Sequence, residues 1–146
     1  TELDRIWAFD ILFGQAGKAQ RHEPRPFNAW TWFKNPAPHQ GVVCPRHILE
    51  AMGGFDTRFR IDMDYDFLLR CHKAGVPLQR TGHLLSFMED GGLSSRRDWP
   101  GLKRRFDEER AVHAKNAYDS GWRWVYPFYW PAYLGYRRLK CLLDRT

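Results

Sequence analysis

Residues 54–70 read GFDTRFRIDMDYDFLLR, and the organisation of the whole chain follows from this stretch. Its second half predicts a helix, because Asp62 or Asp64 stands near the start and Gly75 lies just past the end. Acidic residues at a helix start are stabilised by free backbone N–H groups and by the helix dipole. With Asp66, this start holds more carboxylates than a cap needs. Two interpretations stay open: capping with surface solvation, or a general base whose proton affinity its neighbours adjust.

An ordered series of short motifs surrounds this stretch. In chain order they are His39-Gln40, Arg46 after a short apolar run, Gly53 to Asp56, Phe59-Arg60-Ile61, Asp64-Tyr65-Asp66 through Arg70, and Gly91 to Ser94. In this order and spacing they resemble the second half of the catalytic domain of bacterial family 2 glycosyltransferases, which are inverting enzymes with the GT-A fold. The resemblance covers residues 6–96, and the rest of the chain matches only loosely.

The resemblance implies an α/β fold: the C-terminal half of a GT-A (nucleotide-diphospho-sugar transferase) fold, with a short mixed sheet, flanking helices and a helical C-terminal extension. It divides the chain into an acceptor-side part of the catalytic domain, residues 1–97, and the extension, residues 98–146. In that family the nucleotide pocket and an Asp-x-Asp metal motif lie in the preceding half. The Asp-x-Asp runs here, 62–64 and 64–66, occupy a different place in the pattern. We therefore expect a C-terminal piece of a longer transferase, or a remnant of one.

The resemblance also assigns roles to residues. Asp64 would be the general base that accepts a proton from an acceptor sugar hydroxyl. The expected substrate-binding residues are His39, Gln40, Asp62, Asp66, Gly91, Gly92, Ser94 and Arg96. Asp62 departs from the small residue that is usual in the family and could share the base role. Asp66 and Arg70, four residues apart on a helix, would form a local ion pair.

The implied cofactor is a divalent metal, Mg or Mn, held mainly by residues outside this chain, so no metal ligand is assigned here. The implied partners are a nucleotide-sugar donor and a glycan or lipid-linked acceptor. A second hypothesis, from another class, is a non-catalytic binding or membrane-association module left from a truncated transferase. The His39 side chain could also be structural, and residues 96–97 could be a solvated basic surface.

Composition sets bounds on these hypotheses. The chain has 146 residues, which suits one domain, and a formal net charge of +6, which favours anionic partners such as phosphates, acidic glycans or an anionic membrane. Nucleic acid is not expected, since acidic residues are interspersed with the basic ones and no recognised module is present. Three widely spaced cysteines, Cys44, Cys71 and Cys141, predict neither a disulfide framework nor a zinc site. With no signal peptide at the start, we expect a reducing cytoplasm.

The N-terminal third predicts a hairpin followed by a loop. Strands at 6–13 and 18–22 would be joined by a turn between Gly14 and Gly17, although a helix over 2–13 competes. Residues 23–38 are rich in proline and read as an irregular loop. The aromatic insert within it, residues 30–33, serves either packing or stacking against an acceptor.

The remaining elements are read in the same way. Pro45 would begin a helix over 47–52, and strands over 76–80 and 83–88 would pair with each other before a turn at 89–92. Asp98 would cap a long helix that runs to about Tyr118. The helix would hold Leu102, Phe106, Val112 and Ala117 on its buried side. Its charged residues between 103 and 110, with an Arg104–Glu108 pair, would face solvent.

The C-terminal segment is dense in aromatic and basic residues. Residues 122–134 hold three Trp and three Tyr, and an amphipathic helix with Arg137, Arg138, Lys140 and Arg145 follows. Such a combination is typical of peripheral attachment to an anionic leaflet, here the inner face of the plasma membrane. The alternative is a terminal helix that packs on its own domain or on a partner.

Overall fold

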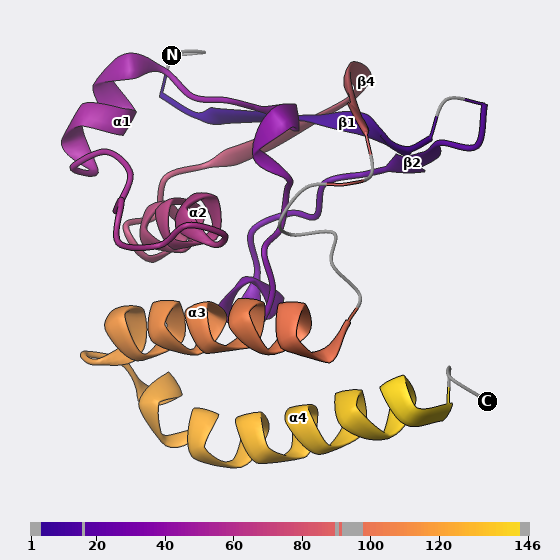
Figure 1. Cartoon of the computed structure of the whole chain (residues 1–146). Helices are drawn as coiled ribbons and strands as arrows, with labels where there is room; N and C mark the ends of the chain where they lie inside the picture. The colour runs from indigo at the N-terminus through magenta and orange to yellow at the C-terminus, as the bar shows by residue number, and fades with distance from the viewer. Residues whose placement is uncertain (1–3, 16, 90, 92–97, 144–146) are drawn as a thin grey trace.

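The computed structural model of the chain describes residues 4–15, 17–89, 91 and 98–143. In chain order the elements are β1 (Ile6–Gly14), β2 (Gln20–His22), η1 (Ala29–Trp32), η2 (His39–Gly41), β3 (Val42–Val43), α1 (Arg46–Ala51), α2 (Met63–Lys73), β4 (Leu78–Glu89), α3 (Trp99–Ala117), η4 (Gly121–Trp124) and α4 (Tyr126–Leu143). They stack in layers, with the sheet at one end, α2 next to it, then α3, then α4 (Figure 1).

The sheet is short and mixed, and β1 is its central strand. β1 pairs antiparallel with β2 and with β3, and it pairs parallel with β4. The mixed α/β class is therefore confirmed, and the hairpin of β1 and β2 replaces the competing helix over the first residues. The narrower assignment, half of a GT-A fold, stays a prediction.

The expected pair of strands over 76–80 and 83–88 is wrong. The structure has one strand, β4, that follows β1 along its length, with a register shift between the pairs Ala8–Arg80 and Asp10–Leu84. Gly82, with φ +71°, makes a bulge here and not a turn. Its carbonyl accepts a 2.8 Å hydrogen bond from Arg21, which also pairs with the buried carboxylate of Asp10.

Apolar clusters hold the layers together. The sheet packs on α1 and α2 through Ile6, Ala8, Ala37, Ile48, Phe67, Leu68 and Cys71. The opposite side of α2 meets α3 through Phe59, Tyr65, Leu69 and Val112. Cys71 of α2 is fully buried in the first cluster and is therefore a core residue. All three cysteines, each of which the structure describes, are free thiols.

The ends of α2 are close to the prediction, but its start is capped from elsewhere. Asp62 directly precedes the helix, yet its side chain makes no capping bond. Instead, the Glu108 carboxylate of α3 accepts hydrogen bonds from the backbone N–H groups of Arg60, Ile61 and Asp62, at 2.9, 2.7 and 3.2 Å. At the other end Gly75 has φ +74°, the left-handed conformation that glycine adopts most readily.

The long helix α3 buries the four apolar residues that the sequence predicted, but its charged face was assigned wrongly. Glu108 turns toward α2 and does not pair with Arg104, and Glu109 is only 6% exposed. Both acids lie where α3 meets other elements. Glu108 accepts hydrogen bonds from backbone N–H groups before α2, and Glu109 pairs with the Lys34 ammonium of the loop. The i,i+4 pair on the solvent side of α3 is Lys103 with Asp107.

Asp66 is the polar centre of the contact between α2 and α3. Its side chain is fully buried and accepts hydrogen bonds from Arg70 at 2.9 Å, Lys115 at 2.8 Å and Asn116 at 2.9 Å. The Arg70–Asp66 pair has the predicted i,i+4 spacing. Arg70 also donates to the carbonyl of Gly54, at 2.7 Å, which fixes the turn after α1.

Replacing Asp66 with Ala should destabilise the chain by about 3–5 kcal/mol, because two cations would lose their shared buried carboxylate. Urea denaturation measures the loss. The matched control is Asp107→Ala, which removes an exposed i,i+4 pair and should change stability by less than about 1 kcal/mol. Equal effects of the two variants would contradict the role given to Asp66.

Candidate functional site

A cavity of about 580 Å³ lies where the 22–40 loop meets the start of α2 and the first half of α3. It is lined by His22, Glu23, Arg25, Lys34, Asn35, Pro36, Pro38, His39, Gln40, Arg60, Ile61, Asp62, Asp64, Tyr65, Met88, Arg105 and Glu109. Four of the predicted site residues, His39, Gln40, Asp62 and Asp64, therefore share one cavity, although they come from two elements separated along the chain.

Asp64 stands in the first turn of α2, where its two oxygens have different surroundings. Oδ1 accepts a 2.8 Å hydrogen bond from the backbone N–H of Tyr65. Oδ2 accepts a 3.1 Å hydrogen bond from the Asn35 amide and lies 3.8 Å from His39 Nδ1. Burial raises the pKa of Asp64, and these hydrogen bonds oppose that rise without cancelling it. The result is a more basic carboxylate than an ordinary Asp, with 16% of its side chain exposed.

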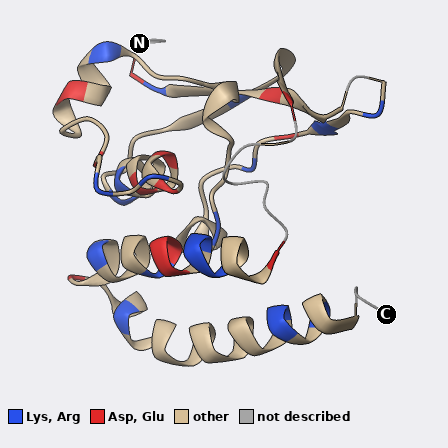
Figure 2. Ribbon diagram, in the orientation of Figure 1, with Lys and Arg blue, Asp and Glu red and all other residues tan. Residues whose placement is uncertain are grey.

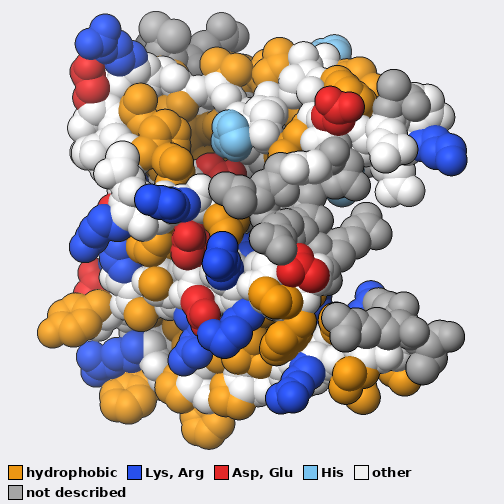
Figure 3. Space-filling model, viewed as in Figure 1, with side chains coloured by type: hydrophobic (Ala, Val, Ile, Leu, Met, Phe, Trp, Pro, Cys, Tyr) orange, Lys and Arg blue, Asp and Glu red, His pale blue; other side chains and the backbone are white. Residues whose placement is uncertain are grey.

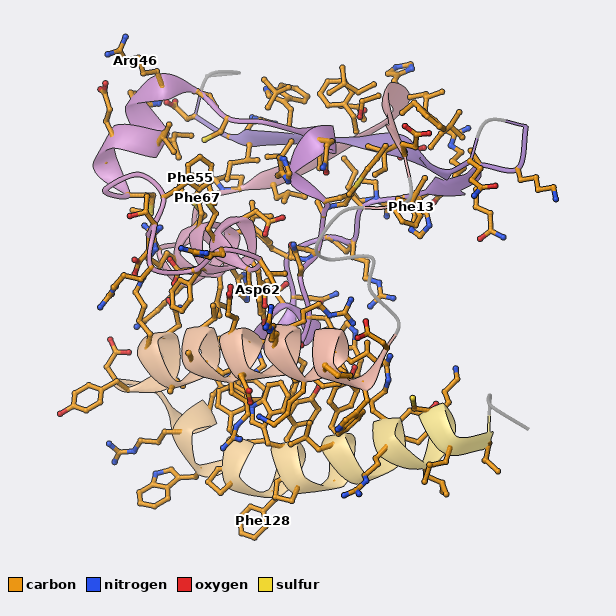
Figure 4. All side chains as sticks on the ribbon, in the orientation of Figure 1. Phe13, Arg46, Phe55, Asp62, Phe67 and Phe128 are labelled. Carbon is orange, nitrogen blue, oxygen red and sulfur yellow. The ribbon has the colours of Figure 1, made fainter. Side chains whose placement is uncertain are left out.

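Asp62 lies between α2 and α3 (Figure 4) in a less balanced environment. Burial, together with the negative charges of Glu109, Asp64 and Glu108, raises the pKa of Asp62 to about 8. Its Oδ2 atom is buried and has no hydrogen-bond partner within the described residues. Asp62 therefore keeps its proton at neutral pH, which makes it a hydrogen-bond donor beside Asp64.

One wall of the cavity is an ion pair that the sequence did not indicate. Lys34 Nζ lies 2.6 Å from Glu109 Oε1, and both side chains are largely buried. Burial alone would lower the pKa of Lys34, but the Glu109 carboxylate outweighs that effect and raises it. Glu109 lies three residues after Phe106 and three before Val112, so its helical spacing placed it on the buried face. Asn35 and Lys34 carry no such signal, since they belong to an irregular loop.

Behind this wall, a neutral histidine joins α3 to α2 and α4. Trp130 Nε1 donates to His113 Nδ1 at 3.2 Å, and His113 Nε2 lies 2.9 Å from the Tyr65 hydroxyl. The Tyr65 hydroxyl in turn donates to the Thr31 carbonyl at 2.9 Å. Burial and the charge of Lys34 lower the pKa of His113 to about 3, so the ring is uncharged. The chain of bonds holds Tyr65 in the cavity wall.

The aromatic insert at 30–33 contributes mainly to packing. Trp32 stacks on Trp122 with ring centroids 5.7 Å apart, and Phe33 contacts Trp122 and Tyr129. The insert forms η1, capped by Asn28. These contacts favour the packing interpretation for Trp32 and Phe33, while Trp30 is 52% exposed.

The other predicted site residues lie elsewhere. Asp66 is fully buried in its ion pairs and does not line the cavity. Gly91 is exposed and is also not among the lining residues, although Met88 near the end of β4 is. Gly92, Ser94 and Arg96 lie outside the described residues.

Over residues 4–15, 17–89, 91 and 98–143, no group of three His, Cys, Asp or Glu side chains is placed to hold a metal ion. In the same ranges, no helix combines the length and apolar character needed to cross a membrane.

Comparison with known proteins gives no neighbour: no family model, curated protein or solved structure matches this chain. The glycosyltransferase resemblance therefore depends on the motifs alone.

The Asp62→Asn variant should gain stability relative to the unaltered chain as pH rises. Because the pKa of Asp62 is about 8 when folded and near 3.8 when unfolded, the folded state of the unaltered chain holds an extra proton between these values. Its stability must then fall from about pH 4 to pH 8 through this group. An amide mimics the protonated acid at every pH.

Urea denaturation at pH 5 and pH 9 checks this expectation. The advantage in stability of the variant over the unaltered chain should be larger at pH 9 than at pH 5. Asp107→Asn, an exposed change on α3, should show the same small difference at both pH values. A pH-independent effect of Asp62→Asn would refute the raised pKa.

Proposed function

We propose that this chain forms the acceptor side of an inverting glycosyltransferase in which Asp64 is the general base. The observation that carries the proposal is the placement of Asp64, Asp62 and His39 around one cavity. The motif order that resembles family 2 glycosyltransferases supplies the reaction class. The cavity geometry supports the proposal because a general base must lie within hydrogen-bond reach of the hydroxyl that it deprotonates.

In the proposed step, an acceptor hydroxyl oxygen attacks the anomeric carbon of a nucleotide sugar from the face opposite the diphosphate. A new carbon–oxygen bond forms, and the bond from the anomeric carbon to the diphosphate oxygen breaks. The leaving nucleoside diphosphate keeps the electron pair of the broken bond. The hydroxyl proton goes to the Asp64 carboxylate, and configuration at the anomeric carbon inverts.

The surroundings of Asp64 suit this role. A raised pKa makes the carboxylate a stronger base, while the hydrogen bonds from Asn35 and Tyr65 fix its orientation. Asp62, which keeps its proton, would donate a hydrogen bond to the acceptor and would not compete for its proton. His39, whose side chain is 65% exposed, is free to contact a sugar at the cavity mouth.

The complete reaction needs groups that the described residues do not supply. The proposed donor is a nucleotide sugar, and the proposed acceptor is a glycan or a lipid-linked sugar. A divalent metal, Mg or Mn, would offset charge on the leaving diphosphate. Its ligands would come mainly from outside this chain. The competing proposal, a non-catalytic binding module, shares the cavity but predicts ligand binding without turnover.

The test replaces Asp64 with Asn in the protein encoded by the complete reading frame. Sugar transfer is measured with a panel of uridine and guanosine diphosphate sugars. We expect kcat to fall at least about 100-fold, because the general base is lost while the cavity shape is kept. Asp107→Asn, on the solvent side of α3, is the matched control and should keep full activity. Near-normal transfer by the Asp64 variant would remove Asp64 from the role.

The pH profile gives an independent check. Because Asp64 must be ionised to accept a proton, kcat should rise with pH and then level off. Burial raises the pKa of Asp64, so the rise should fall above the range of an ordinary Asp. An Asn35→Ala variant removes a hydrogen bond to the ionised form and should move the rise to still higher pH. A profile that does not change with Asn35→Ala would contradict the assignment of this limb to Asp64.

A further inference from the structure

The terminal helix α4 has one buried side and one exposed side. Tyr126 and Trp130 are buried against α3, where they join a cluster with Leu102, Phe106 and Ala117. The Trp130 indole also donates to His113 of α3. This side of α4 is therefore fixed by packing on the rest of the chain, which was one of the two interpretations of the C-terminal segment. The packing also determines which side of α4 faces outward.

The exposed side is a continuous apolar stripe, which we call the outer face of α4. Its large members are Phe128, Tyr136, Leu139, Leu142 and Leu143, all exposed, and the exposed side chains of Trp124 in η4 and of Val125 precede it. Within the helix, positions 128, 132, 135, 136, 139, 142 and 143 recur every three or four residues, which aligns them along one side. Phe128 points away from the body of the molecule (Figure 4), and apolar side chains gather along the α4 border in the space-filling view (Figure 3). Phe128 is 80% exposed.

The charged residues of α4 all have one sign. α4 contains Arg137, Arg138 and Lys140 and no Asp or Glu, as the ribbon coloured by charge shows (Figure 2). Arg138 and Lys140 are exposed. By helical spacing they lie on opposite borders of the stripe, at about 100° per residue. Arg137 differs, because its guanidinium turns back over the Phe106 ring at 5.3 Å.

We propose that the outer face of α4 docks on an anionic lipid bilayer, with the helix lying in the plane of the interface. Large apolar and aromatic side chains enter the boundary between headgroups and acyl chains, and basic side chains at both borders contact lipid phosphates. The charge pattern selects this occupant. A second copy of the chain would bring basic borders against basic borders, whereas anionic headgroups match them.

The docking surface is separate from the cavity. No residue of α4 lines the cavity, and α3 lies between the two. A bilayer against α4 would therefore leave the cavity open. The docking proposal does not depend on glycosyl transfer, so each can fail without the other.

Vesicle co-sedimentation of the whole chain tests the proposal. The probes are vesicles of pure phosphatidylcholine and vesicles that also contain phosphatidylglycerol. We expect binding that strongly prefers the anionic vesicles and weakens with added salt. The Phe128→Ser/Leu139→Ser variant should lose at least about tenfold in partitioning, because two large apolar groups no longer leave water. The Arg138→Gln/Lys140→Gln variant should lose about fivefold per residue on anionic vesicles only.

A matched control separates the outer face from general stickiness. Leu84→Ser/Phe87→Ser changes two similarly exposed apolar residues on β4, and it should bind vesicles as the unaltered chain does. Circular dichroism verifies that each variant is folded. Absence of binding to anionic vesicles by the unaltered chain would overturn the proposal. So would unchanged binding by Phe128→Ser/Leu139→Ser, or an α4-dependent dimer without vesicle binding in analytical ultracentrifugation.

Discussion

The Asp66 carboxylate is buried away from water, so protein groups must supply its hydrogen bonds. The arrangement of the helices provides these donors. Arg70 reaches it from the next turn of α2, while Lys115 and Asn116 reach it from α3. These bonds fix how α2 and α3 lie against each other. The start of α2 is held in turn by Glu108 of α3. The cavity lies between these two helices and the loop, so its shape depends on the same contacts.

The acids near the cavity differ because their surroundings differ. Glu108 has backbone N–H groups, and Glu109 has the Lys34 ammonium. Asp64 accepts hydrogen bonds from the Asn35 amide and from a backbone N–H, whereas Asp62 has three acidic neighbours and one oxygen without a hydrogen-bond partner among the described residues. The effect of burial on the pKa is therefore opposed by hydrogen bonds at Asp64 and reinforced by negative charges at Asp62. Surroundings that push two carboxyl pKa values apart are the condition under which one group can donate a proton and the other accept one.

The sequence predicted those features that depend on neighbours along the chain. The hairpin of β1 and β2, the ends of α2 and the apolar side of α3 all follow from spacing and from glycine positions. The sequence predicted two strands separated by Thr81 and Gly82, whereas the structure has the single strand β4. The difference arises because β4 pairs with β1, which is remote in sequence. The burial of Glu109 and His113 depends on Lys34, Tyr65 and Trp130 in the same way. Of the cavity residues, His39, Asp62 and Asp64 were predicted from the spacing of the motifs. The role of Asn35 could not be predicted, because its hydrogen bond to Asp64 forms only when the loop folds against α2.

The edge position of β4 has a consequence for the behaviour of the polypeptide in solution. Among the described residues β4 pairs with β1 alone, so one row of its backbone groups faces outward without a strand beside it. Leu84, Leu85 and Phe87 on the same strand are about half exposed. An apolar, unpaired edge is a template for intermolecular strand addition. We therefore expect the isolated polypeptide to aggregate through this edge. A segment that added a strand there would widen the sheet and would also prevent such aggregation.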